Sequence, residues 1–171
     1  MERPGAIRGA GLILGLGVDL VEVARMEKAL ARGERIVQRL FTAGEIAYCR
    51  RHKEPARHFA ARFAAKEAGM KALGTGWSNG VSWQNFEVRH DPRGRPHLYI
   101  TGRAAEVAAA LGATHALITL AHDGGFATAV VAIEGDGAAP HTEGHGFVSG
   151  RTAIGEPAPP PRFDAEQGEV T

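Results

Sequence analysis

Residues 56–74 read ARHFAARFAAKEAGMKALG and carry the strongest helix signal in the sequence. It is rich in alanine, and Phe59, Phe63 and Met70 lie within about 40° of one another on a helical wheel. Gly74 follows as a natural C-terminal cap. We therefore predict a long helix over Ala56–Leu73 with this apolar stripe on its buried face.

Upstream of this helix, Leu12–Leu20 alternates with a period of two. Leu14, Leu16 and Val18 share one face, while two glycines and Asp19 share the other. This pattern predicts a strand that ends on an acid.

Helices are expected between this strand and the long helix. Apolar residues recur at helical spacing over residues 23–30, and an apolar face continues through residues 36–40. Thr42 and Glu45 match a capping box, which predicts a helix that begins there and runs to about His52.

The region after the long helix indicates strands joined by turns. Residues 91–94 have turn composition, and Asp123-Gly124-Gly125 is a strong hairpin signal. The expected elements are strands at Val81–Arg89 and Pro96–Ile100, a helix at Arg103–Leu111, and strands at His115–Ala121 and Phe126–Glu134. Together they predict an α+β fold with an antiparallel sheet.

Length and composition indicate one domain with a tail. Residues 135–171 hold seven glycines, five prolines and no sustained apolar pattern, so we predict a Pro/Gly-rich, disordered tail. Residues 1–11 are expected to be a leader, which leaves 12–134 as the domain. No apolar stretch is long enough to cross a bilayer. The single Cys49 cannot form an intramolecular disulfide, which favours a cytoplasmic location.

The charge of the chain is unevenly distributed. The net charge is +1, but residues 135–171 carry −4 and the rest therefore carries +5. Residues 25–57 hold nine bases and four acids, which favours an anionic partner. The alternative is an ordinary solvated helical face. Nucleic acid is disfavoured, because no aromatic residues interleave with these bases as a stacking platform.

Asp19 and the charges of the long helix are the candidate chemical groups. Asp19 suits a metal ligand or catalytic acid, and the alternative is a helix N-cap. On the helix, Arg62 and Lys66 form one i,i+4 pair and Glu67 and Lys71 another. One carboxylate with three cations fits Mg²⁺ and a polyphosphate, while the alternative is a salt-bridged helix face.

Taken together, these segments resemble the holo-acyl-carrier-protein synthases, the short type of 4′-phosphopantetheinyl transferase. The resemblance covers roughly residues 12–134. The matching segments are GLGVDLVE at 15–22, FAARFAAKEA at 59–68, KALGTG at 71–76, Gly94-Arg95-Pro96 and TLAH at 119–122.

The resemblance implies a 4′-phosphopantetheinyl transferase-like fold, in which an antiparallel sheet packs with the long helix. It implies transfer of phosphopantetheine from coenzyme A to a serine of acyl carrier protein, in fatty acid biosynthesis. Asp19, Glu67 and Lys71 would be the catalytic residues. Asp19 and Glu67 would ligand Mg²⁺, and Lys71 and Gly74 would contact the pyrophosphate. The candidate base for the serine proton is Glu67 or a water bound to the metal that it holds.

The resemblance also implies contacts at the other end of coenzyme A. Arg62 and His122 would hold the 3′-phosphate, and the Arg93-Gly94 turn would lie against adenine. Arg25 would meet an acid of the carrier protein. Family members form homotrimers with sites between subunits, and many carry a hydroxyl residue where this chain has Ala121. Two alternatives are a coenzyme A- or nucleotide-binding module without catalysis and a basic interaction module.

Overall fold

The computed structural model describes residues 12–135 and 152–153. The predicted leader lies outside the described residues, and so does most of the predicted tail. The elements in chain order are β1 (Leu12–Glu22), α1 (Val23–Leu30), α2 (Glu34–Leu40), α3 (Ala43–Arg50), α4 (Pro55–Leu73), the 3₁₀ turn η1 (Trp83–Asn85), β2 (Phe86–His90), β3 (Pro96–Ile100), α5 (Gly102–Ala110), β4 (Ala113–Asp123), β5 (Phe126–Gly135) and β6 (Thr152–Ala153). Among the described residues, no helix is long and apolar enough to cross a membrane.

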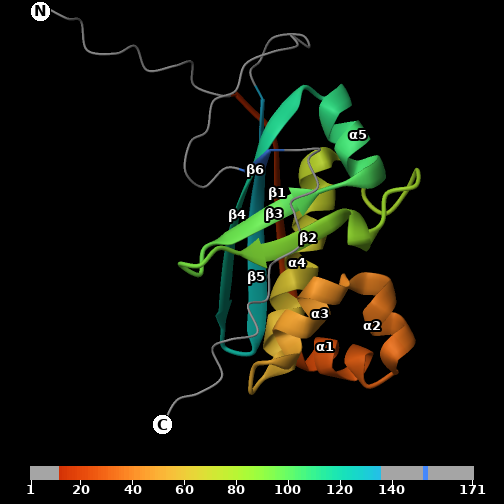
Figure 1. Ribbon diagram of the computed structural model, residues 1–171, viewed down its shortest axis with the longest axis vertical. Coiled ribbons are helices and arrows are strands. Elements are labelled where there is room, and N and C mark those ends of the chain that lie inside the picture. Colours follow the sequence, from red (N-terminus) through yellow and green to blue (C-terminus); the bar gives the residue numbers. More distant parts are fainter. Residues whose placement is uncertain (1–11, 136–151, 154–171) are drawn as a thin grey trace, which may run out of the picture.

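The strands form two antiparallel sheets. The larger has the order β1-β5-β4-β6, and β2 pairs with β3 in a separate hairpin. The helix α4 lies along the larger sheet, with α1, α2 and α3 gathered near one end of it and α5 near the other (Figure 1). This confirms the predicted α+β fold of an antiparallel sheet packed with a long helix.

The glycine face of β1 is the face that packs on α4. A Cβ on Gly15 would lie 1.9 Å from the Ala72 carbonyl oxygen, and one on Gly17 would lie 2.0 Å from that of Ala68. The leucine-rich face of β1 is exposed instead. Glycine therefore lets strand and helix approach closely, and this approach brings the next residue on the same face, Asp19, beside α4.

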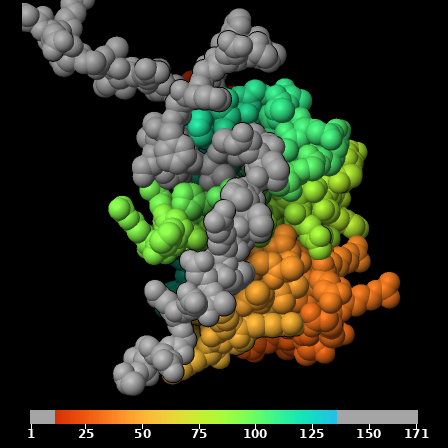
Figure 2. Space-filling view, viewed as in Figure 1, coloured from red at the N-terminus to blue at the C-terminus, as the bar shows by residue number. Residues whose placement is uncertain are grey.

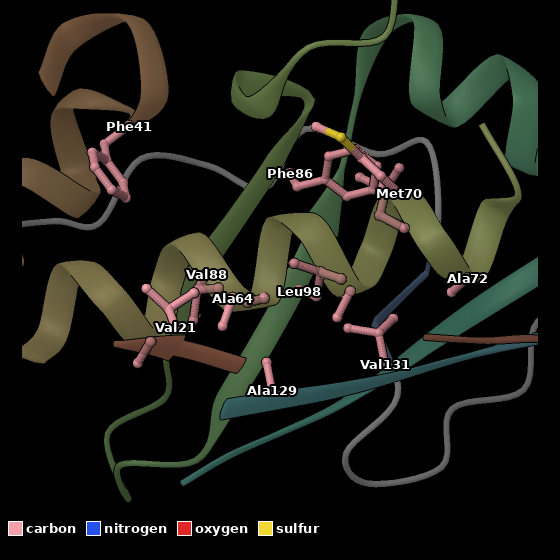
Figure 3. Close-up of a cluster of buried hydrophobic side chains, with 14 of the residues drawn as sticks. Val21, Phe41, Ala64, Met70, Ala72, Phe86, Val88, Leu98, Ala129 and Val131 are labelled. Carbon is pink, nitrogen blue, oxygen red and sulfur yellow. The ribbon is translucent and has the colours of Figure 1, made fainter. Parts of the chain in front are cut away.

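Small side chains fill the interface between α4 and the sheet. Figure 3 shows Ala64 and Ala72 of α4 above Ala129 and Val131 of β5, and all four are buried. Such side chains allow close packing of a helix on a sheet, and a buried apolar interface of this kind is the main source of stability. The helix α4 is thereby fixed against β1.

One predicted strand is shorter than expected. The prediction of a strand from Val81 is wrong up to Asn85, because Ser82 and Asn85 cap each other and close the turn η1. The strand β2 begins only at Phe86, where β3 supplies a partner for every residue. In contrast, the capping box of Thr42 and Glu45 is present at the start of α3.

Candidate active site

Asp19 and Lys71 form an ion pair between β1 and α4. The Lys71 ammonium donates to Asp19 Oδ1 at 2.8 Å and to the Val18 carbonyl at 3.1 Å. The Lys71 side chain is 52% exposed and that of Asp19 is 18% exposed. Asp19 does not end its strand, because β1 continues to Glu22, and Glu22 rather than Asp19 is the N-cap residue of α1. The helix-cap alternative for Asp19 is therefore wrong.

Glu67 lies one helical turn before Lys71, but the two do not pair. The Trp83 indole donates its Nε1–H to Glu67 Oε1 at 2.6 Å instead. The Trp83 ring stacks on Trp77 with centroids 5.3 Å apart and on Phe63 at 6.4 Å. The carboxylate thus has one oxygen fixed by the indole and a second without a hydrogen bond among the described residues.

Asp19 and Glu67 open into one cavity of about 560 Å³. Arg25 and Lys28 of α1 line the same cavity, as does Arg32 just after that helix, and Trp83 lies on its wall with several apolar residues. The cavity therefore combines two carboxylates with a basic helix. The structure brings Asp19, Glu67 and Arg25 to one cavity, with Lys71 held to Asp19 at 2.8 Å.

Lys66 belongs to the core and not to this site. Its ammonium lies 2.7 Å from Glu45 Oε2, and both side chains are 0% exposed. It also donates to the backbone carbonyls of Trp83, at 2.9 Å, and Phe86. Burial lowers the pKa of Lys66, and the Glu45 charge opposes that shift. The expectation that Lys66 is one of three cations available to a polyphosphate beside Glu67 is therefore wrong.

Arg62 is also buried, at 1% exposed, but it lies among titratable rings. Its guanidinium carbon is 3.9 Å from the centroid of the Tyr48 ring. One terminal nitrogen lies 3.2 Å from His90 Nδ1, and the other donates to the His58 carbonyl at 3.4 Å. The buried Nε has no partner among the described residues.

Histidines extend this cluster around Arg62. The rings of His52 and His58 stack with centroids 3.8 Å apart, and Tyr48 stacks on His90 at 4.8 Å. Burial first, then the charges of neighbours that include Arg62, lowers the pKa of His58 to about 4, and burial and Arg62 lower that of His90 to about 4. Both rings are therefore neutral at pH 7.

The remaining predicted ligand residues do not line the Asp19 cavity. His122 lies exposed near the end of β4, and its charge is among the causes that lower the pKa of His58. Arg93 and Gly94 form the exposed turn of the β2–β3 hairpin, which projects from the body of the molecule (Figure 2).

Gly74 caps α4 in the left-handed region and donates its N–H to the Lys71 carbonyl. Ala121 is exposed on β4.

Trp83, which contacts Glu67 directly, is not among the site residues predicted from the sequence. A signal for it was present, because Ser82 and Asn85 have the spacing of a mutual cap. That spacing predicts a turn at Trp83 instead of a strand. It does not predict which side chain the indole would reach, since Glu67 lies 16 residues away in the sequence.

Comparisons with known proteins agree on one family. The sequence profile of the 4′-phosphopantetheinyl transferase superfamily matches residues 15–131. The holo-acyl-carrier-protein synthase of Koribacter versatilis is 46% identical over 124 residues, 72% of this chain and 99% of that protein. The Neisseria meningitidis synthase structure is 30% identical, covers 72% of this chain and 99% of its own, and superimposes with a TM-score of 0.66. The Bacillus anthracis synthase structure, solved with CoA (3′,5′-ADP), is 34% identical, covers 74% of this chain and 99% of its own, and superimposes with a TM-score of 0.61.

Proposed function

This chain belongs to the 4′-phosphopantetheinyl transferase superfamily, and we propose that it transfers the 4′-phosphopantetheine arm of coenzyme A to a serine of an apo-acyl carrier protein, releasing adenosine 3′,5′-bisphosphate. The observation that carries this function is the cavity in which Asp19 and Glu67 face the basic helix α1. Such a cavity can hold a metal-bound pyrophosphate beside an acidic macromolecular substrate. The product would serve fatty acid and lipid biosynthesis.

Asp19 and Glu67 are the proposed Mg²⁺ ligands. Mg²⁺ takes one or two carboxylates together with phosphate oxygens and water, and two carboxylates line the cavity. The described residues contain no cluster of three or more histidines, cysteines and acids that could hold a metal. The Lys71 ammonium already lies 2.8 Å from Asp19, so a cation is accommodated there. When bound, Mg²⁺ would neutralise charge on the pyrophosphate of coenzyme A.

The residues of the chain itself would mainly position and neutralise charge, as in other phosphoryl transfers. The serine hydroxyl attacks the β-phosphorus, and Glu67 is the candidate base for its proton. Lys71 is half exposed and has one N–H without a partner among the described residues, so it can turn toward the leaving group. Gly74 presents no side chain to obstruct a phosphate at the end of α4.

We assign the adenosine end of coenzyme A to a second copy of the chain within a homotrimer. Arg62, His122 and the Arg93-Gly94 turn do not line the Asp19 cavity, which supports a ligand shared between two chains. The outer face of β1 offers an interface, because its large apolar side chains, Leu12, Leu14, Leu16, Val18 and Leu20, are all exposed. Exposed apolar patches of this kind mark protein interfaces. Light scattering should give three copies of the 18.1 kDa chain.

The carrier protein would dock beside α1. Arg25, Lys28 and Arg32 line the cavity that contains the carboxylates, so a docked acidic helix would bring its serine close to Glu67. A cytoplasmic location fits Cys49, which is buried and unpaired.

The deciding experiment is mass spectrometry of a purified apo-carrier protein after incubation with this protein, coenzyme A and Mg²⁺. We expect a mass gain of one phosphopantetheine, with adenosine 3′,5′-bisphosphate in equal amount. Excess EDTA should stop the reaction. A carrier that binds but gains no mass would reduce the chain to a binding module.

A further inference from the structure

We propose that Trp83 is a positioning residue for Glu67, and that its indole N–H sets the affinity of the site for a divalent cation. This inference rests on the proposed function, because it takes Glu67 as a metal ligand. The contact that carries it is the 2.6 Å hydrogen bond from Trp83 Nε1 to Glu67 Oε1. Both side chains line the same cavity.

The backbone of Trp83 is held from two directions. Ser82 and Asn85 cap the turn η1 on which Trp83 lies, with Ser82 N donating to Asn85 Oδ1 at 2.9 Å. The Trp83 carbonyl accepts a hydrogen bond of 2.9 Å from Lys66, whose ammonium is anchored in the core by Glu45. The backbone that carries the indole is therefore fixed by the buried Lys66–Glu45 ion pair.

The indole ring is also held in place. It stacks on Trp77 at 5.3 Å and on Phe63 at 6.4 Å, and the Arg39 guanidinium lies 6.0 Å from its centroid. Stacked aromatic rings favour one orientation of the ring plane. The ring therefore offers its N–H in a fixed direction.

A fixed indole donor suits a metal-binding carboxylate. Indole is a donor only and does not change charge near neutral pH. By engaging Oε1 of Glu67, Trp83 fixes the rotation of the carboxylate and leaves Oε2 without a hydrogen bond among the described residues. Carboxylates that ligate metals are commonly held by such a second contact, and loss of that contact typically weakens metal affinity or activity by about 10- to 100-fold.

The test compares Trp83→Phe, which keeps an aromatic ring but lacks the N–H, with Trp77→Phe, which alters the same stack without touching Glu67. Mn²⁺ binding is measured by electron paramagnetic resonance with the full chain and saturating coenzyme A. We expect Trp83→Phe to weaken Mn²⁺ binding by about 10-fold or more and to lower kcat while the KM for coenzyme A changes little. Trp77→Phe should stay within about twofold of the wild type, as substitutions away from special contacts do.

The outcomes separate this inference from the proposed function. Wild-type affinity in Trp83→Phe, beside a loss in Glu67→Gln, would overturn the role of Trp83 and leave the metal site standing. A wild type that binds no Mn²⁺ would overturn both. In the Glu67→Gln background, Trp83→Phe should cause no further loss, because the two residues act through one contact.

A second measurement does not depend on the folding of Trp83→Phe. The chain has two tryptophans, so Trp77→Phe leaves Trp83 as the single one. Its fluorescence should change as Mg²⁺ is added with coenzyme A present, and Glu67→Gln in the same background should abolish that change. A Trp83 signal that does not respond to Mg²⁺ would overturn the inference.

Discussion

Helix α4 makes two lysine–carboxylate pairs of nearly equal length in opposite surroundings. Lys66 lies 2.7 Å from Glu45, and Lys71 lies 2.8 Å from Asp19, yet the first pair is wholly buried and the second has its lysine half exposed. All three N–H bonds of Lys66 are used, by Glu45 and two backbone carbonyls. Lys71 uses two within the described residues, so it can still engage a ligand.

A short ion pair therefore does not by itself mark a functional site. The Lys66 pair joins α4 to α3, and Glu45 also accepts from the Val88 N–H of β2 at 3.0 Å, so this pair connects three elements. The Lys71 pair joins β1 to α4 at the rim of a cavity. We expect the first to affect mainly stability and the second mainly activity.

The largest expected effect is on catalysis. Asp19→Asn and Glu67→Gln should each lower kcat by about a thousandfold, equivalent to about 4 kcal/mol, because each removes a proposed metal ligand. Circular dichroism and the urea midpoint should remain close to those of the wild type. A variant that keeps more than about a tenth of the wild-type kcat has lost less than about 1.4 kcal/mol, too little for a metal ligand.

The next effect is on stability. Lys66→Met should lower the free energy of unfolding by about 3 kcal/mol or more, because it leaves the Glu45 charge buried without its partner. The matched control is Lys71→Met, which should cost less than about 1 kcal/mol because Lys71 is half exposed, but should lower kcat. Urea denaturation measures both. Equal losses of stability in the two variants would remove the distinction between the pairs.

A third effect concerns Arg62, which is buried like Lys66 but is a proposed ligand for the 3′-phosphate. Arg62→Ala should chiefly raise the KM for coenzyme A, since that phosphate does not react. Arg62→Lys, which keeps the charge, is the control. The assay uses coenzyme A and 3′-dephospho-coenzyme A. A variant that still strongly prefers coenzyme A would show that Arg62 does not bind the 3′-phosphate.

A fourth effect follows from the histidines around Arg62. Because the pKa values of His58 and His90 are about 4 in the folded chain and their ordinary value is 6.5, the unfolded chain binds more protons between these limits. The contribution of these two histidines to the free energy of unfolding is therefore fully present above pH 6.5 and is lost as the pH falls toward 4. The double variant His58→Gln/His90→Gln should show a smaller drop in melting temperature between pH 7 and 4.5. An unchanged drop would mean that other groups cause it.

The smallest expected effect is on docking. Arg25→Glu should raise the KM for the carrier protein several-fold at low salt and less at high salt, because the Debye length shortens from about 10 Å at 0.1 M. The KM for coenzyme A should change little. Titrations with carrier protein at two ionic strengths measure this. Equal penalties at both would place Arg25 outside the docking surface.

Local patterns predicted the fold well because they depend on neighbours in the sequence. The alternation over Leu12–Leu20, the capping box at Thr42 and the terminal Gly74 each describe contacts within a few residues, and each appears in the structure. The start of β2 was wrong because η1 depends on a side-chain cap that competes with the strand pattern.

The charged residues of α4 were harder to separate. Lys66 and Lys71 look alike in sequence, and only the position of Glu45, 21 residues upstream, decides that Lys66 is buried. The sequence likewise did not predict which face of β1 is exposed, since alternation shows that the two faces differ but not which one packs on the helix. Distant partners therefore set the part of the site that the sequence did not predict.

The glycine face of β1 has a further consequence for the register between strand and helix. Two residues of strand advance about 6.6 Å, and four residues of helix advance about 6.0 Å. Gly15 and Gly17 on one side therefore keep nearly equal step with Ala72 and Ala68 on the other. Because these two advances differ slightly, the glycines of the strand and the alanines of the helix stay opposite each other over a short distance only. A methyl group at either glycine would displace helix α4 from strand β1 and move Glu67 away from Asp19. Substitution of a glycine that has no side chain would therefore impair the site as substitution of a site residue does.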